Sequence, residues 1–266
     1  MTVRGEPFGT RREVRAGRLV KFVLVCIAAN LLASCAAAGP GTPEAARVAL
    51  VNHSSPADDL YNGQFCGGAL VGPSVVATAS HCVEGKRPGL IDVVVGAENL
   101  CKTAPIVGER LRVVEIISQS SSNPQISLLR LESHSDSGPL HIAEAGVGEE
   151  LKFVGWGRTS DGGTPPCRTK NIILKRVGFE QCEMYLKPLD ASDLSRDLFV
   201  CAIPRSQSSL NTCQGDSGSP VISFREGQWA VAGLTLGGAT CEADSPGIYI
   251  SAESIQAALK DITTSL

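Results

Sequence analysis

Aromatic residues are scarce in this chain of 266 residues, at 5% of the total. An excess of one charge is also missing, because 24 basic residues stand against 27 acidic ones and the formal net charge is -3. That balance leaves no electrostatic footprint for nucleic acid, which we exclude as a partner. The ten cysteines contain no C-x-x-C pair and are irregularly spaced, so we predict no metal and no cofactor.

What the chain does contain favours a turn-rich globular fold. Apolar residues make up 43% of it, with 28 glycines and 15 prolines. The length suffices for one large all-β domain or two small ones.

The first residues resemble an export signal. A basic stretch precedes an apolar run, Phe22 to Ser34, that is too short to span a bilayer. We therefore predict a signal peptide over residues 1–34, and LASC (32–35) resembles a bacterial lipobox that would place a lipid on Cys35. Ordinary cleavage at the following alanines is the alternative. The mature protein is then a bacterial cell-surface lipoprotein or a secreted protein, with a flexible tether over 35–46.

If Cys26 is removed with the signal peptide and Cys35 carries the lipid, eight cysteines remain. In an oxidising compartment an even number favours four disulfides, and a zinc site is the competing interpretation. The remaining cysteines are Cys66, Cys82, Cys101, Cys167, Cys182, Cys201, Cys213 and Cys241.

Short β-type runs follow one another along residues 47–250, separated by Gly, Pro, Asn and Ser clusters. The predicted strands are Val48–Val51, Ala69–Ala77, Ile91–Val95, Leu111–Ile117, Ile126–Leu131, Leu151–Val154, Asn171–Val177, Leu198–Ile203, Pro220–Ser223, Trp229–Leu236 and Gly247–Ile250. The end of the chain is helical in pattern: Ser251 is a candidate cap, and Ile255, Ala258, Leu259 and Ile262 share one face.

Two stretches carry chemistry. CQGDSGSP (213–220) places glycines near Ser217 on both sides, which let the backbone turn tightly and present N–H donors. A plain Gly/Ser turn is the alternative interpretation of this stretch. FCGGAL (65–70) and TASHC (78–82) place His81 beside a cysteine at the end of an apolar strand. A histidine has the near-neutral pKa needed to take a serine proton and return it.

Together with FVGWGRT (153–159) and PGIY (246–249), these stretches resemble the chymotrypsin and trypsin family of serine proteases. The resemblance implies an all-β fold of two packed six-stranded Greek-key barrels, about 47–143 and 144–250, with a C-terminal helix over about 251–264. It also implies that His81 is the base, Ser217 the nucleophile, and the N–H groups of Gly215 and Ser217 the oxyanion hole. The disulfides that it implies are Cys66–Cys82, Cys182–Cys201 and Cys213–Cys241, which leaves Cys101 for Cys167.

The chain departs from the family pattern at three places. Gln125 stands in PQISLL (124–129) where the family has the aspartate that orients the histidine. In GLTLGG (233–238), Leu236 and Gly237 replace a serine and a tryptophan of the family. No Ile-Val-Gly-Gly segment precedes the domain, so Asp216, which pairs with a freed amino terminus in the family, needs another partner.

The resemblance assigns the substrate pocket to Asn211, Thr212, Gly238 and Gly247. The predicted floor is polar and neutral, with no carboxylate for an arginine or lysine side chain.

Three functions follow as hypotheses. The first is an exported serine endopeptidase, slowed by Gln125, that hydrolyses polypeptide substrates through an acyl-enzyme as a monomer. The second is a pseudoprotease that binds or inhibits a protein ligand through its loops. The third, suggested only by the lipobox, is a non-catalytic component of the cell envelope.

Overall fold

The computed structural model describes residues 41–101, 107–118, 125–186, 196–205, 210–238, 240–242 and 245–264. The predicted signal peptide (1–34), Cys35 and the first part of the tether lie outside these residues. The end of the predicted tether is packed, because Ala45 and Ala46 are buried and Arg47 donates a hydrogen bond to the Thr42 carbonyl at 2.7 Å. The folded domain therefore begins before residue 47.

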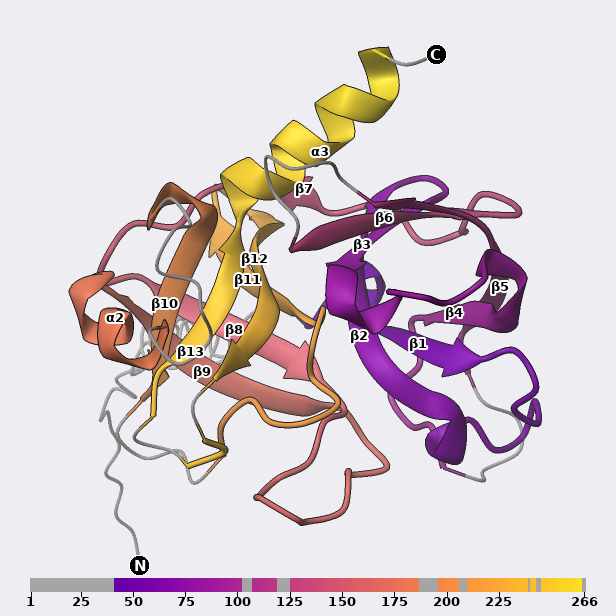
Figure 1. Cartoon of the computed structure of the whole chain (residues 1–266), viewed down its shortest axis with the longest axis horizontal. Helices are drawn as coiled ribbons and strands as arrows, with labels where there is room; N and C mark the ends of the chain where they lie inside the picture. Colours follow the sequence, from indigo (N-terminus) through magenta and orange to yellow (C-terminus); the bar gives the residue numbers. More distant parts are fainter. Residues whose placement is uncertain are drawn as a thin grey trace, which may run out of the picture. The chain divides into compact units, whose positions relative to one another are not determined.

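Six antiparallel strands close a first barrel in the order β1-β2-β3-β6-β5-β4 (Figure 1). All five residues of β4 are buried, and four of them are the β-branched types that suit a pleated surface. The strands are β1 (Val48–Asn52), β2 (Gln64–Gly72), β3 (Val75–Ala79), β4 (Ile91–Val95), β5 (Glu109–Ser118) and β6 (Ile126–Leu131).

A second barrel runs in the order β11-β8-β9-β10-β13-β12, and pairing of β11 with β12 closes it. A short strand, β7 (His141–Ile142), adds to β12 in parallel. The six barrel strands are β8 (Glu150–Gly155), β9 (Lys170–Val177), β10 (Phe199–Pro204), β11 (Pro220–Arg225), β12 (Gln228–Gly238) and β13 (Gly247–Ser251). The predicted all-β fold of two barrels is thus confirmed.

Helices are few among the described residues. The C-terminal helix α3 (Ala252–Thr264) continues from β13, and Ser251 Oγ accepts the N–H of Ser254 at 3.2 Å, which confirms the predicted cap. Ile255 and Ala258 are buried, whereas the side chain of Ile262 lies outside the described part. Helix α2 (Glu180–Leu186) was not predicted. The 3-10 turns are η1 (Glu44–Ala46), η2 (Tyr61–Gly63), η3 (Ser80–Cys82), η4 (Pro88–Leu90) and η6 (Arg196–Leu198). No helix within these ranges is long and apolar enough to span a bilayer.

One predicted strand was wrong. The run Ala69–Ala77 is two strands, β2 and β3, which pair with each other across a turn at Pro73 and Ser74. Proline has no N–H for a ladder and a fixed φ, so it ends one strand and begins the hairpin.

All four disulfides form with the expected partners: Cys66–Cys82, Cys101–Cys167, Cys182–Cys201 and Cys213–Cys241. Four disulfides fit a protein of an oxidising compartment.

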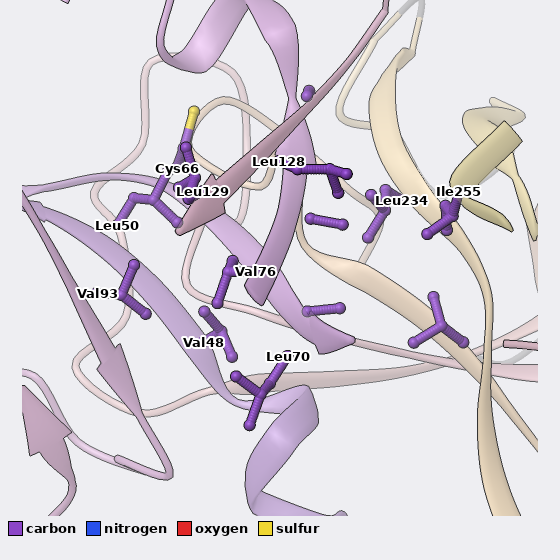
Figure 2. Close-up of a cluster of buried hydrophobic side chains, with 14 of the residues drawn as sticks. Val48, Leu50, Cys66, Leu70, Val76, Val93, Leu128, Leu129, Leu234 and Ile255 are labelled. Carbon is purple, nitrogen blue, oxygen red and sulfur yellow. The ribbon is translucent and has the colours of Figure 1, made fainter. Parts of the chain in front are cut away.

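The largest apolar cluster joins the two barrels and the last helix. Figure 2 shows Val48, Leu70 and Leu129 of the first barrel in a cluster that extends to Leu234 of β12 and Ile255 of α3. Each of these side chains is nearly inaccessible to solvent. Their shared burial fixes the junction between the barrels, where the predicted catalytic residues lie.

Candidate active site

His81 sits at the edge of the first barrel, directly after a buried strand. Strand β3 pairs with β6 and then turns into η3, which carries His81 between Ser80 and Cys82. The disulfide from Cys82 to Cys66 ties this turn to β2, and a ring nitrogen of His81 lies within 4.8 Å of both sulfurs. Because both sulfurs are in a disulfide, this group does not fit a metal site.

Ser217 lies on the loop between β10 and β11, and glycines shape that loop. Gly215 and Gly218 have φ values of +91° and +79°, a region that other residues rarely adopt. A Cβ on Gly218 would stand 2.3 Å from Thr78 Oγ1 and 2.4 Å from the Gly67 carbonyl oxygen. The loop therefore touches the first barrel so closely that only glycine fits.

Two contacts bring the halves of the predicted catalytic pair to one place. The N–H of Gly67 donates to the Ser217 carbonyl at 2.8 Å, and Cys82 Sγ lies 3.6 Å from the same oxygen. His81 is the neighbour of Cys82 in the chain. In the described part of the chain the side chains of His81 and Ser217 make no hydrogen bond with each other; in apo enzymes such bonds are often long and tighten only with substrate.

The two peptides on either side of Gly215 are each held through their carbonyl oxygen. The N–H of Arg158 donates to the Gln214 carbonyl at 2.8 Å, and Gln64 Nε2 donates to the Gly215 carbonyl at 3.0 Å. In a planar trans peptide the N–H points opposite to the C=O, so the N–H of Gly215 faces away from Arg158. Neither this N–H nor that of Ser217 donates to an acceptor within the described ranges. Two backbone N–H groups of the Ser217 loop are thus without an acceptor in the described part of the chain.

Gln125 lies near His81, as the resemblance implies. Its carbonyl accepts the N–H of Ser80 at 2.9 Å, and it borders a hollow of about 640 Å³ together with His81 and Ser118. Beneath it, the buried Ser127 hydroxyl lies 3.0 Å from Ser80 Oγ and 3.2 Å from Ser118 Oγ. The hydroxyls of Ser80, Ser118 and Ser127 thus lie together at this edge of the first barrel.

The electrostatics of His81 agree with this neutral setting. His81 keeps an exposed part of its surface, yet partial desolvation of the ring lowers its pKa, and the charge of Glu84, three residues along the chain, raises it in part. The other departure, Leu236, is half-buried and packs against the apolar cluster.

A hollow of about 240 Å³ opens beside Ser217 and is the candidate substrate pocket. Of the predicted pocket residues, Thr212 and Gly238 line it. Asn211 is buried behind it, where Nδ2 donates to the carbonyls of Glu242 and Ser245, each at 2.7 Å.

Gly247, which was also predicted to line the pocket, is not among the residues that line this hollow. It makes room for Tyr249, whose hydroxyl would lie 2.5 Å from an added Cβ. The carboxylate of Asp161 lines the hollow, and the sequence analysis missed it because it comes from a separate loop.

Asp216 is held below the loop by groups from three segments. Its Oδ1 accepts the N–H of Gly157 at 2.6 Å, and its Oδ2 accepts the N–H of Cys213 at 2.8 Å. Lys170 Nζ lies 2.5 Å from Oδ2. The sequence indicated that Asp216 needs a partner, but nothing in it singled out Lys170 among the lysines.

Comparison with known proteins agrees with this geometry. The sequence pattern of the family described as Trypsin matches residues 41–259. This chain belongs to the trypsin family. It is 28% identical over 195 residues to a trypsin of Saccharopolyspora erythraea, a match that covers 70% of this chain and 81% of that protein.

Two animal proteins are also similar to this chain. Serine proteinase stubble of Drosophila melanogaster is 28% identical over 202 residues, and ovochymase-2 of Mus musculus is 29% identical over 213. The matches cover 69% and 70% of this chain but only 25% and 34% of those proteins. Trypsin-family membership supports a domain of the serine peptidase type.

We expect an NMR titration to find the pKa of His81 below its usual value, because burial disfavours the imidazolium. Glu84→Gln should lower this pKa further, since the substitution removes the charge that favours the protonated ring. Glu180→Gln, on α2, is the control and should leave it unchanged. A pKa of His81 above the usual value would contradict this description, because it would require a carboxylate against the ring.

Proposed function

We propose that this protein is a serine endopeptidase that hydrolyses peptide bonds through an acyl-enzyme. The proposal is carried by one observation: the N–H groups of Gly215 and Ser217 have no acceptor among the described residues, and the Arg158 and Gln64 contacts fix the peptides around them. Such preorganised donors stabilise the negative charge that develops on a carbonyl oxygen during acyl transfer.

The proposed reaction uses the side chains at the barrel junction. The Ser217 hydroxyl attacks the peptide carbonyl carbon while a ring nitrogen of His81 takes its proton. The C–N bond then breaks, His81 gives the proton to the leaving amine, and an ester remains on Ser217. Water attacks this ester by the same route, and the carboxylic acid product leaves as the serine regains its proton.

Gln125 makes the proposed enzyme slow. With an amide in place of the carboxylate, the imidazolium that forms in each step loses its ionic partner, a change that costs about 10⁴-fold in rate in this family. The lowered pKa of His81 also slows the proposed reaction, because the protonated ring that forms in each step is less favoured. The amide oxygen of Gln125 can still accept a ring N–H and orient the histidine.

A second candidate function is that of a pseudoprotease that binds or inhibits a protein ligand. Two observations favour it: Gln125 at the position of the family's aspartate, and the apolar Leu236 at that of a family serine. The two functions differ in whether the Ser217 hydroxyl reacts.

Labelling with a fluorophosphonate tests this difference, because the probe forms an Oγ–P bond and releases fluoride only at an activated serine. We expect slow labelling of the wild type and none of Ser217→Ala. Gln125→Asp should raise the labelling rate at least about tenfold, since a carboxylate stabilises the imidazolium.

The control for charge alone is Gln181→Asp, on the exposed face of α2, which should label at the wild-type rate. Absence of labelling in both the wild type and Gln125→Asp would reject the peptidase and favour the binding module.

We also propose that the protein is exported and carries a lipid on Cys35. The four disulfides support export, and LASC (32–35) supports the lipid. Cys35→Ala should move the protein from the membrane fraction to the soluble fraction on ultracentrifugation. A wild-type protein that is already soluble would rule out lipidation.

A further inference from the structure

A buried ammonium lies beneath the loop that carries Ser217. Lys170 is the first residue of β9, and its side chain is 2% exposed, while that of Asp216 is fully buried. Lys170 Nζ donates to Asp216 Oδ2 at 2.5 Å, to the Arg158 carbonyl at 2.7 Å and to the Asn211 carbonyl at 3.2 Å. Its three N–H groups therefore match three acceptors.

The two charges depend on each other. Burial lowers the pKa of Lys170 and raises that of Asp216, and for each group the charge of its partner opposes the effect. Asp216 also accepts two backbone N–H groups, so the pair is fully hydrogen-bonded. A buried carboxylate without such a cation would be strongly unfavourable.

The same ammonium orients both sides of the candidate oxyanion site. Through Asp216 it holds the residue that directly precedes Ser217. It also donates to the Arg158 carbonyl and so holds the segment around Arg158. The N–H of Arg158 in turn fixes the Gln214 carbonyl, which sets the direction of the Gly215 N–H. Removal of one charge would therefore loosen both donors together.

We propose that Lys170 is a positioning residue that supplies, from within the folded chain, the cation that sets the oxyanion loop, so that the site assembles without a newly cut amino terminus. This rests on the proposed peptidase function for its catalytic meaning. The positioning itself follows from the contacts of Lys170, Asp216 and Arg158.

Hydrogen exchange measured by mass spectrometry on the full chain tests the positioning. In Lys170→Met we expect amides of residues 213–219 to exchange at least about 100-fold faster, the scale expected for an unpaired buried charge. Exchange in β1 and β4 should not change. Lys175→Met is the matched control, because Lys175 is exposed on the same strand, and it should behave as the wild type.

Fluorophosphonate labelling adds a functional readout. Lys170→Met should lower the maximal labelling rate of Ser217 at least about 100-fold with little change in the probe concentration at half-maximal rate, because the donors act on developing charge. A full chain with an uncleaved tag at its amino terminus should label as fast as an untagged chain. Labelling that appears only after the terminus is cut would overturn the proposal.

A double variant covers the case in which Lys170→Met does not fold. Lys170→Met with Asp216→Asn leaves no buried charge, so it should fold, yet its 213–219 amides should still exchange faster and its labelling should remain slow. Wild-type exchange and labelling in the double variant would refute a positioning role for Lys170. If the wild type never labels but Lys170→Met loosens the loop, the peptidase proposal fails and the positioning proposal stands.

Discussion

A carboxylate buried next to the candidate nucleophile is the constraint on which the rest of this site depends. Asp216 has no exposed surface, so its charge must be balanced by groups that the fold delivers. Those groups come from β9, from the segment after β8 and from the loop itself, as Lys170 and the N–H groups of Gly157 and Cys213. The ion pair therefore holds together three separate segments, and the candidate oxyanion donors belong to Gly215 and Ser217, the residues on either side of Asp216.

Contacts at the junction of the two barrels position the loop of Ser217 and the turn that carries His81. Gly218 allows the second barrel to approach Thr78 and Gly67 of the first, and the Gly67 N–H then holds the Ser217 carbonyl. The Cys66–Cys82 disulfide keeps His81 at the same junction. Among the described residues no carboxylate is hydrogen-bonded to the ring of His81, although the charge of Glu84 favours its protonated form in part. A slow peptidase and a binding module are therefore the two proposals for the function of this site.

The sequence predicted local features well and long-range ones only through a family resemblance. The strands Ile91–Val95 and Ile126–Leu131 agree with β4 and β6 because their apolar patterns are local. The two-residue strand β7 is too short for such a pattern, and the continuous apolar run Ala69–Ala77 predicts one strand where Pro73 separates two. Spacing does not reveal that Lys170 reaches Asp216, that Asn211 turns away from the pocket, or that Asp161 enters it. These follow from tertiary packing, in which residues far apart in the chain become neighbours.

A crystal structure of the wild-type protein with a peptide boronate is the most direct test of the central claim, that the Lys170–Asp216 pair holds two donors ready for an oxyanion. The account predicts a bond from boron to Ser217 Oγ and a boronate oxygen about 3 Å from the N–H groups of both Gly215 and Ser217, with Lys170 still on Asp216. A boronate whose oxygen points elsewhere, with the Gln214 carbonyl turned into the site or Asp216 turned away from Lys170, would contradict it.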